Sequence, residues 1–400
     1  MVKKGEKMRI LILSRYTTDR RSATVVHELN KIKDVEVFNL TWGDHPELHP
    51  LRNMFSCGLD TFDFPQFTCH FDRPNTADPI ALEMCLKEFR PHVTIITSEV
   101  YEKGTHEQID LCQKYGSKVA LVAWQNTMPD HKEKDPIIRN YIKKTFEMSD
   151  MILVGSTYAR KWHEKFGEAN FVVVPFLAVK QGIFFPMKKK DFIREETKKM
   201  RDEWKNKFVV SYIGRFLEWK GIVFMAEAMD KLMTENEDMC FFAVGKGFDD
   251  DAPIDKQAQI KLNYFVTKWG ARAKIFPYAK TGDHLNEYFN CSDIYLYPSL
   301  PKYGRIIEQF GVMMPDSGLA GVPCIGPTIG GSMDIIAHKE TGYLVEPGSS
   351  EAIIEAIKMY RALTNDEKIL MKEKAVELNQ QWLGHNIAKK IVNSLKKIIK

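Results

Sequence analysis

Cysteine is sparse in this chain, and no two cysteines stand close together. The 400 residues include 7 cysteines, and none of them forms a Cys-x-x-Cys pair. Disulfide frameworks and structural zinc sites depend on closely spaced cysteines. We therefore expect reduced cysteines in the core and no metal site built from them.

Long apolar runs are absent as well. No stretch approaches the roughly 20 apolar residues that a membrane-spanning helix needs. The N-terminal sequence MVKKGEKMRILILS begins with basic residues, as a signal peptide does, but its apolar part is short and no small-residue cleavage pattern follows. We interpret this segment as a first strand and expect a cytoplasmic protein.

Neither sign of charge is in large excess. The chain has 57 Lys and Arg residues against 53 Asp and Glu residues, a formal net charge of +4, which is too small to indicate a nucleic-acid partner. The densest charged run, Lys188–Lys207, contains both signs. We interpret it as a solvated helix that leads out of an interdomain linker; contact with an anionic membrane surface is the alternative.

The apolar pattern predicts an α/β protein with two doubly wound parallel sheets. Short β-branched runs alternate with longer amphipathic stretches, which is typical of parallel strands joined by crossover helices. In the first half we predict strands at Met8–Leu13, Val35–Asn39, His92–Ile96, Lys118–Ala123, Met151–Val154 and Phe171–Val174, and helices at Ala23–Lys31, Ala81–Glu88, His106–Tyr115 and Ile137–Met148. The segment Thr41–Arg73 is expected to be irregular. In the second half we predict strands at Phe208–Ile213, Cys240–Val244, Ala273–Phe276, Ile294–Tyr297, Pro323–Ile325 and Gly342–Val345, and helices at Gly221–Met233 and Ile260–Trp269.

The domain boundaries follow from the charged run Lys188–Lys207, which separates the two sets of predicted strands. Residues 1–186 form a first Rossmann-like domain, residues 187–384 a second, and residues 385–400 a C-terminal helix. That helix has apolar residues on one face and lysines on the other, and its apolar face comprises Ile387, Ile391, Leu395 and Ile398. We expect it to pack back on the first domain; contact of its lysines with anionic lipid at the inner membrane face is the alternative.

Three glycine-containing segments of the second half each follow a predicted strand. In the first, Gly214-Arg215 ends a strand and Lys220-Gly221 opens a helix. Glycine lets the backbone pass close to a ligand, a helix N-terminus attracts phosphate, and two cations can hold a diphosphate. Taken alone, the segment also fits an ordinary strand–helix junction with surface cations.

The second segment, Glu308-Gln309-Phe310-Gly311, leads into a helix that contains Asp316. The two carboxylates, Glu308 and Asp316, bracket the amides that follow Gly311. These amides can meet phosphate or sugar oxygens, and the carboxylates can accept hydrogen bonds from hydroxyl groups at either end of a ligand. A nucleotide sugar has such hydroxyls on its sugar and on its ribose; an exposed pair of acids is the simpler alternative.

The third segment, Thr328-Ile329-Gly330-Gly331, is another turn between a strand and a helix. The carboxyl ends of parallel strands meet at one edge of the sheet, and ligands of open α/β sheets bind in the crevice there. Three such turns together therefore predict a ligand site in the second half.

In this order the segments resemble the donor-binding half of retaining GT-B glycosyltransferases of family 4, the glycosyl transferases group 1. That family has Gly-Arg, then Lys-Gly, then a Glu followed seven residues later by Glu-Ala-Met-Ala-x-Gly-x-Pro, and then a Gly-Gly turn. The resemblance runs from about Ser211 to Glu346, and Ser149–Ser156, Val173–Pro186, Glu99 and Trp124-Gln125-Asn126 resemble parts of the family's first domain and crossover.

The sequence departs from the family pattern in four places. Asp316 replaces the second Glu and has a shorter reach, and Gly318 stands where Met is usual. Lys180 stands where the crossover usually has Asp, and the segment after the first strand, Tyr16–Arg21, lacks the usual Gly-Gly pair. The ribose contact and the acceptor contacts therefore stay open.

The resemblance implies two Rossmann-like domains facing a cleft, and transfer of a sugar from a nucleotide-diphosphate sugar to a carbohydrate or lipid-linked acceptor. It implies catalytic roles for Arg215 and Lys220, at the leaving diphosphate, and for Glu308, at the sugar hydroxyls. The donor would further contact Gly214, Phe310, Gly311, Val312, Asp316, Gly330 and Gly331, with Asp316 at the ribose. Glu99, Gln125 and Asn126 would face the cleft from the acceptor side. The nucleotide sugar is a co-substrate, and neither a cofactor nor a metal is expected.

Other functions stay open at this point. A GT-B-like nucleotide-sugar epimerase, a phosphorylase and a catalytically inactive nucleotide-sugar-binding partner are the alternatives. A Rossmann dehydrogenase is disfavoured because Gly-x-Gly-x-x-Gly follows the first strand of neither half. Asp249-Asp250-Asp251 resembles the DxD metal site of another glycosyltransferase fold, but an acidic solvated turn is the simpler interpretation. No base is identified; His131 is a candidate, and the leaving phosphate oxygen could itself take the proton.

Overall fold

The computed structural model describes residues 5–14, 20–42, 66–69, 77–124, 127–128, 130–247, 253–279, 281–301 and 307–399. The chain divides into two compact units. Unit 1 comprises Met1–Lys180 and Trp382–Lys400, and unit 2 comprises Gln181–Gln381.

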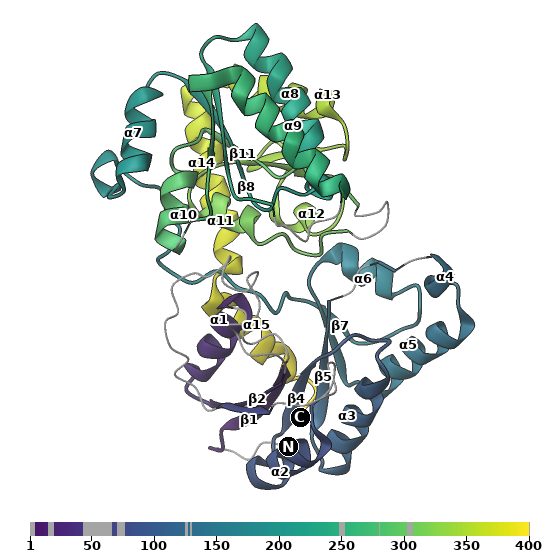
Figure 1. The fold of residues 1–400 in the computed structure, drawn as a ribbon. Helices are drawn as coiled ribbons and strands as arrows, with labels where there is room; N and C mark the ends of the chain where they lie inside the picture. The colour runs from purple at the N-terminus through teal and green to yellow at the C-terminus, as the bar shows by residue number, and fades with distance from the viewer. Residues whose placement is uncertain are drawn as a thin grey trace. The chain divides into compact units, whose positions relative to one another are not determined.

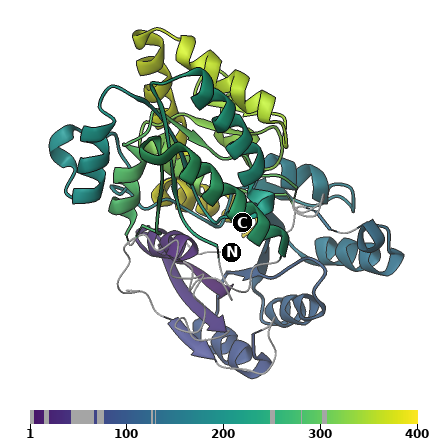
Figure 2. The ribbon, with the colours of Figure 1, turned by 45° about the horizontal axis from the view of Figure 1, so that its top comes forward.

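Unit 1 contains a seven-stranded parallel sheet in the order β3-β2-β1-β4-β5-β6-β7. Its strands are β1 (Met8–Ser14), β2 (Val35–Trp42), β3 (Gln66–Cys69), β4 (Val93–Thr97), β5 (Lys118–Ala123), β6 (Met151–Val154) and β7 (Phe171–Val173). Its helices are α1 (Arg20–Asn30), α2 (Pro79–Phe89), α3 (Lys103–Lys114), α4 (Asp130–Glu133), α5 (Pro136–Met148), α6 (Thr157–His163) and α15 (Gly384–Leu395). Helices lie on both sides of the sheet (Figures 1 and 2), so the central strands β1 and β4 are almost entirely buried and mostly apolar, as is usual in parallel sheets.

One strand of unit 1 was not predicted. Gln66–Cys69 pairs in parallel with Asn39–Trp42 of β2 and so lies inside the segment that the sequence analysis expected to be irregular. The prediction was wrong because an edge strand this short shows too little alternation of apolar and polar residues to be recognised. The other predicted strands of unit 1 are confirmed, with small differences at their ends.

The C-terminal helix α15 packs against α1 within unit 1. Its residues Ile387, Ile391 and Leu395 are buried, because they recur at the three- to four-residue spacing of one helix face. Ile398, expected on the same face, lies beyond the end of the helix and is half-buried.

Unit 2 contains a six-stranded parallel sheet in the order β10-β9-β8-β11-β12-β13. Its strands are β8 (Phe208–Ile213), β9 (Met239–Val244), β10 (Ala273–Phe276), β11 (Ile294–Leu296), β12 (Cys324–Pro327) and β13 (Gly342–Val345). Its helices are α7 (Glu195–Glu203), α8 (Ile222–Glu235), α9 (Pro253–Trp269), α10 (Gly282–Phe289), α11 (Met313–Leu319), α12 (Ser332–Ile335), α13 (Ser350–Ala362) and α14 (Asn365–Asn379). The core of the unit packs apolar faces of α8, α9 and α13 against the central strands, with Met229, Phe241 and Ile357 fully buried.

Both sheets reverse their strand order once. The reversal lies between β1 and β4 in unit 1 and between β8 and β11 in unit 2. In open parallel sheets the loops that follow two such strands diverge and leave a crevice at the carboxyl edge, where ligands bind. The fold thus indicates where to look for a site in each unit.

The charged run Lys188–Lys207 is anchored within unit 2 and is not solvated on all sides. It forms α7, and Arg194 just before this helix donates hydrogen bonds to Glu287 (Nη1–Oε1, 2.6 Å) and Asp283 (Nη2–Oδ2, 2.6 Å) of α10. The side chain of Glu287 is 1% exposed, and Thr197 of α7 donates a further hydrogen bond to it. One face of α7 is therefore fixed to α10 by a buried carboxylate.

Glu287→Gln is expected to lower the free energy of unfolding near neutral pH by about 1–3 kcal/mol, because Gln keeps the shape but loses the charged hydrogen bonds. Burial raises the pKa of Glu287, but the Thr197 hydroxyl and the Arg194 guanidinium outweigh it and hold that pKa below its usual value. A carboxyl group with a lowered folded-state pKa stabilises the fold above its unfolded pKa of about 4.3, and this stabilisation is lost as the pH falls through the folded-state value.

Urea unfolding between about pH 7 and about pH 3 tests this. Wild type should lose stability in acid more steeply than Glu287→Gln. Glu355→Gln, an exposed position on α13, is the control and should leave the curve unchanged. Parallel curves for wild type and Glu287→Gln would contradict the assigned role of Glu287.

Candidate functional site

The loops after β8 and β11 are held together at the reversal point of the sheet in unit 2. After β8 the chain forms a short 3₁₀ turn, Glu218–Lys220, and Gly221 then begins α8 with φ 74°. A Cβ at Gly221 would lie 2.0 Å from the carbonyl oxygen of Pro298, so only glycine fits at this approach. The amide of Leu300 donates to the carbonyl of Trp219 at 2.7 Å.

Lys220 and Glu308, two of the three predicted catalytic residues, form an ion pair at this point. Lys220 Nζ also donates to the hydroxyl oxygen of Tyr297 at 3.2 Å. The ammonium group lies 4.0 Å from the ring centre of Trp219 and 5.2 Å from that of Tyr297. The side chain of Lys220 is 15% exposed and that of Glu308 is 28% exposed, so the pair is positioned by its neighbours and still reaches solvent.

The Lys220 ammonium keeps Glu308 ionised. Burial raises the pKa of Glu308, but the charge of Lys220 and hydrogen bonds from Lys220 and Tyr297 outweigh burial, and the pKa lies below its usual value. Burial, together with the Glu308 carboxylate, raises the pKa of Tyr297 well above its usual value. The site therefore presents a carboxylate that only accepts hydrogen bonds, next to a fixed positive charge.

The Gly330-Gly331 turn lies directly against the main chain of the second segment. A Cβ at Gly330 would lie 2.3 Å from the carbonyl oxygen of Glu308, and a Cβ at Gly331 would lie 2.3 Å from that of Gln309. The amide of Gly331 donates to the Glu308 carbonyl at 3.2 Å. This turn thus sets the position of the Glu308 main chain.

The remaining predicted donor residues lie around the same edge. Gly214 donates its amide to the Val244 carbonyl at 3.0 Å, and the Arg215 carbonyl accepts from the Tyr212 hydroxyl at 2.6 Å. Phe310 and Gly311 are buried, and Val312 is half-buried just before α11.

Asp316 is fully buried in α11. It therefore lies beneath the surface of the site. For its carboxylate to accept a hydrogen bond from a ribose hydroxyl, the ligand would have to reach into the unit.

The predicted acceptor-side residues belong to unit 1. Glu99 follows β4 at the reversal point of that sheet, and its carbonyl accepts from the Thr105 hydroxyl at 3.0 Å. Gln125 and Asn126 lie outside the described residues, as do Asp249–Asp251. Among the described residues, no group of three or more His, Cys, Asp or Glu side chains could hold a metal ion.

Two positioning residues were missed by the sequence analysis. Tyr297 was assigned to a strand, but β11 ends at Leu296. Trp219, which directly precedes Lys220, was given no role. The signal for Tyr297 was its place as the first residue after a strand at the reversal point of the sheet.

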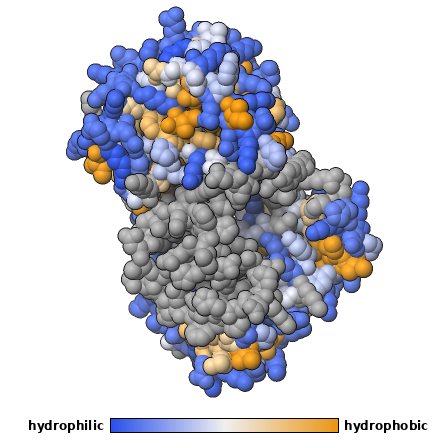
Figure 3. Space-filling model, in the orientation of Figure 1, coloured by the Kyte–Doolittle hydropathy of each residue, from blue (hydrophilic) through white to orange (hydrophobic). Residues whose placement is uncertain are grey.

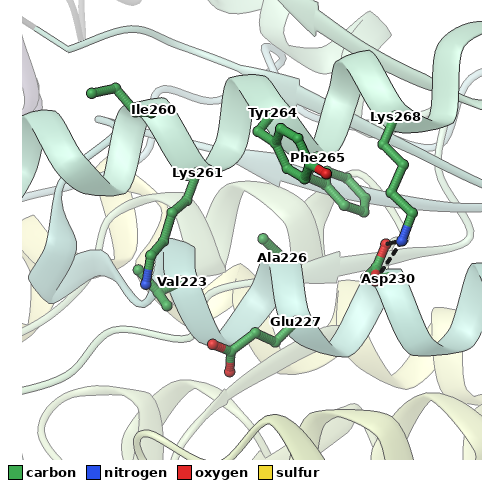
Figure 4. Close-up of a pocket in the computed structure, with 9 residues that line it drawn as sticks. All are labelled: Val223, Ala226, Glu227, Asp230, Ile260, Lys261, Tyr264, Phe265 and Lys268. Carbon is green, nitrogen blue, oxygen red and sulfur yellow. Dashed lines mark hydrogen bonds and ion pairs between the residues drawn. The ribbon is translucent and has the colours of Figure 1, made fainter.

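A hollow of unit 2, about 370 Å³, lies between α8 and α9 (Figure 4). An ion pair from Lys268 Nζ to Asp230 Oδ1 (2.6 Å) closes one end of it. The exposed side chains of Ile260 and Tyr264 make it partly apolar. The coloured part of the surface in Figure 3 is mostly hydrophilic, with several hydrophobic groups. Neither the glycine turns nor the Lys220–Glu308 pair lines this hollow, so it is separate from the candidate site.

Two Rossmann-like domains in one chain, each with the strand order described above, define the GT-B fold. Solved structures match nearly the whole chain. Alr3699/HepE of Anabaena in complex with UDP has a TM-score of 0.74 at 14% identity over 98% of this chain and 100% of that one. Sucrose-phosphate synthase of Thermosynechococcus elongatus has a TM-score of 0.69 at 15% identity over 98% and 99% of the two chains.

Residues 193–378 match the family described as Glycosyl transferases group 1. An uncharacterized glycosyltransferase of Methanocaldococcus jannaschii is 24% identical over 188 residues, 47% of this chain and 44% of the relative. N-acetyl-alpha-D-glucosaminyl L-malate synthase of Bacillus anthracis is 23% identical over 224 residues, 55% and 52% of the two chains. The chain thus spans about half the length of these relatives.

In the part of the chain that the structure describes, no helix is both long and apolar enough to cross a membrane.

Proposed function

We propose that this protein is a retaining, metal-independent glycosyltransferase of family 4. It transfers a sugar from a nucleotide-diphosphate sugar held in unit 2 to a carbohydrate or lipid-linked acceptor. The observation that carries the proposal is the Lys220–Glu308 pair, fixed by Trp219 and Tyr297 at the reversal point of the unit 2 sheet. The family match from residue 193 to residue 378 includes this pair and all three glycine turns.

The charges of the pair suit the two halves of a nucleotide sugar. Lys220 is a compact cation for a diphosphate oxygen, and Arg215, in the same loop, supplies a second cation. Glu308 is ionised and accepts hydrogen bonds from the hydroxyls of the donor sugar. Cations positioned at the diphosphate stabilise the negative charge that develops on it as the sugar leaves.

In the proposed reaction the bond between the anomeric carbon and the diphosphate oxygen breaks. The acceptor oxygen forms its new bond to that carbon on the face from which the diphosphate leaves, so the anomeric configuration is retained. The acceptor's proton passes to the departing phosphate oxygen, and a nucleoside diphosphate is released. A pair of carboxylates of the glycosidase type is not required.

A nucleoside diphosphate is expected to raise the melting temperature of the protein. The similar protein HepE has been solved in complex with UDP and with UDP-glucose, so UDP is the first compound to test, beside GDP and ADP. A ligand at a hundred times its dissociation constant stabilises the native state by about 2.7 kcal/mol. The Lys220→Ala variant should lose most of the shift, and equal shifts in both proteins would contradict the assignment of the diphosphate to Lys220.

The configuration of the product tests retention separately. Proton NMR of the transferred sugar should show the anomeric configuration of the donor. An inverted product would contradict the retaining mechanism while leaving the transferase in place. Donor conversion without an acceptor would instead indicate an epimerase, and sugar release to inorganic phosphate would indicate a phosphorylase.

A further inference from the structure

A groove lined by cations lies within unit 1, between the edge strand β7 and helix α15. Its volume is about 660 Å³. The half-buried residues Phe171, Val172 and Val173 form an apolar side. Positive charge comes from Lys389 and Lys390 of α15, from Lys397 just after this helix and from Arg160 of α6. No carboxylate is among the residues that line the groove.

The lysines of α15 face this groove because the opposite side of the helix is buried on α1. Lys389, Lys390 and Lys397 are exposed, and among the described residues no ion pair or hydrogen bond engages their ammonium groups. Arg160 pairs with Glu164 at 2.7 Å. The groove therefore holds a local excess of positive charge in a chain whose formal net charge is only +4.

The other basic segment of the chain differs in this respect. In Lys188–Lys207, Arg194 pairs with Asp283 and with the buried Glu287, and Lys199 lies 3.9 Å from Glu203. Its charges are partly offset within unit 2. The contact with anionic lipid that both segments suggested from the sequence is thus favoured for α15 alone.

We propose that this groove binds the phosphate headgroup of an anionic phospholipid, so that unit 1 attaches peripherally to a membrane surface. The lysines attract the phosphate, and the apolar side contacts the glycerol and the first methylene groups of the lipid. Basic residues near an anionic bilayer each strengthen binding several-fold, and they act together with buried apolar area. The inference does not depend on the proposed transfer reaction.

The main chain of β7 argues against an added peptide strand as the occupant. The Asn170 carbonyl accepts a hydrogen bond from the Ile152 amide of β6 at 3.0 Å, and the Val174 amide donates to the Val154 carbonyl of β6 at 2.8 Å. In a parallel ladder, every second residue of a strand bonds to the same neighbouring strand. The main-chain groups of Phe171 and Val173 therefore point away from β6. The Phe171 amide already donates to Ala169 at 2.9 Å. An added strand would therefore find few donors, so the charged side chains dominate recognition.

Cosedimentation of the full chain with vesicles tests the proposal. Wild type should bind vesicles of equal phosphatidylcholine and phosphatidylglycerol at low salt, bind pure phosphatidylcholine vesicles far less, and release as salt screens the charges. The triple variant Lys389→Gln, Lys390→Gln, Lys397→Gln should bind about a hundredfold more weakly. Arg160→Gln alone should weaken binding about fivefold, the usual effect of one basic residue near an anionic surface. This variant tests the groove itself, because Arg160 lines the groove but lies on α6.

A matched control removes the same charge elsewhere. Lys231, Lys256 and Lys261 are exposed on α8 and α9 of unit 2, and replacing all three with Gln should leave vesicle binding within about twofold of wild type. All six positions are exposed, so unchanged melting temperatures should show that both triple variants are folded.

Three results would overturn the proposal. The first is no binding of wild type to anionic vesicles at low salt, and the second is an equal loss in the unit 2 control. The third is a soluble ligand, glycerol phosphate or a polyglutamate peptide, that binds through Lys389, Lys390 and Lys397 more tightly than anionic vesicles do. Glycerol phosphate binding would indicate a free phosphate ester as the occupant, and polyglutamate binding an acidic protein.

Discussion

Lys220→Ala is expected to lower the rate of sugar transfer by about 10²- to 10³-fold, the usual loss when one positioned electrostatic group is removed from a transition state. Lys220 is the cation next to Glu308, and the rings of Trp219 and Tyr297 hold it in place. If it acts mainly on the leaving diphosphate, kcat falls more than the donor's binding affinity does. Steady-state kinetics and donor titration separate these two effects.

Glu308→Ala should reduce transfer by a similar factor, through loss of the hydroxyl contacts and of the charge that orients Lys220. Because the two residues form one pair, the double variant should lose less than the product of the single losses. A double variant whose loss of transfer equals the product of the two single losses would contradict a shared site. Lys231→Ala, an exposed position on α8, is the control and should retain normal rates.

These losses should not arise from unfolding. Removing one member of a fully buried ion pair costs about 3–5 kcal/mol. The cost here is expected to be smaller, since the Glu308 side chain is 28% exposed and lies beside Tyr297. Both single variants should therefore show cooperative unfolding at only moderately lower temperatures.

Gly330→Ala is expected to reduce transfer by about a hundredfold, since a displacement of about 1 Å in a positioned group can cost that much. The new Cβ would lie 2.3 Å from the Glu308 carbonyl oxygen, so the main chain that carries the Glu308 side chain must move. Transfer rates and the melting temperature of the purified variant measure the two consequences.

Gly348→Ala is a matched control for backbone strain. Gly348 and Gly330 have similar positive φ values of 77° and 68°, but the nearest neighbours of a Cβ at Gly348 lie at 3.7 Å. Both substitutions should destabilise unit 2 through strain in the left-handed region, and only Gly330→Ala should impair transfer strongly. Equal loss of transfer in the two variants would show that the contact with Glu308 is unimportant.

Much of the fold follows from local patterns in the sequence. The apolar run Lys118–Ala123 predicts a buried parallel strand, and β5 has these bounds. The short edge strand β3 could not be found in this way. Helix α14 was not assigned, although the capping box of Thr364 and Glu367 is a recognisable start signal.

The candidate site follows from local patterns only in part. Lys220 and Glu308 were identified by resemblance to a family, each within its own segment. Their contact joins residues 88 positions apart, and spacing along the chain cannot show such a contact. The same holds for the approach of Gly330 to the Glu308 carbonyl, because it depends on how the loops after β11 and β12 pack.

The burial of Asp316 is also a product of packing. Local sequence places an acid in the first turn of a helix, where it could face a ligand, but α11 is buried along its whole length. The sequence pattern of a helix this short does not show which of its sides stays open.

Release of nucleoside diphosphate by the full chain is the strictest test of the proposed sugar transfer. The protein is incubated with UDP-, GDP- and ADP-linked sugars and a panel of carbohydrate and lipid-linked acceptors, and the free nucleoside diphosphate is measured. We predict acceptor-dependent release from at least one donor, and its near-complete loss in Lys220→Ala. Tight binding of a donor without release in any combination would contradict it and would identify a catalytically inactive nucleotide-sugar-binding protein.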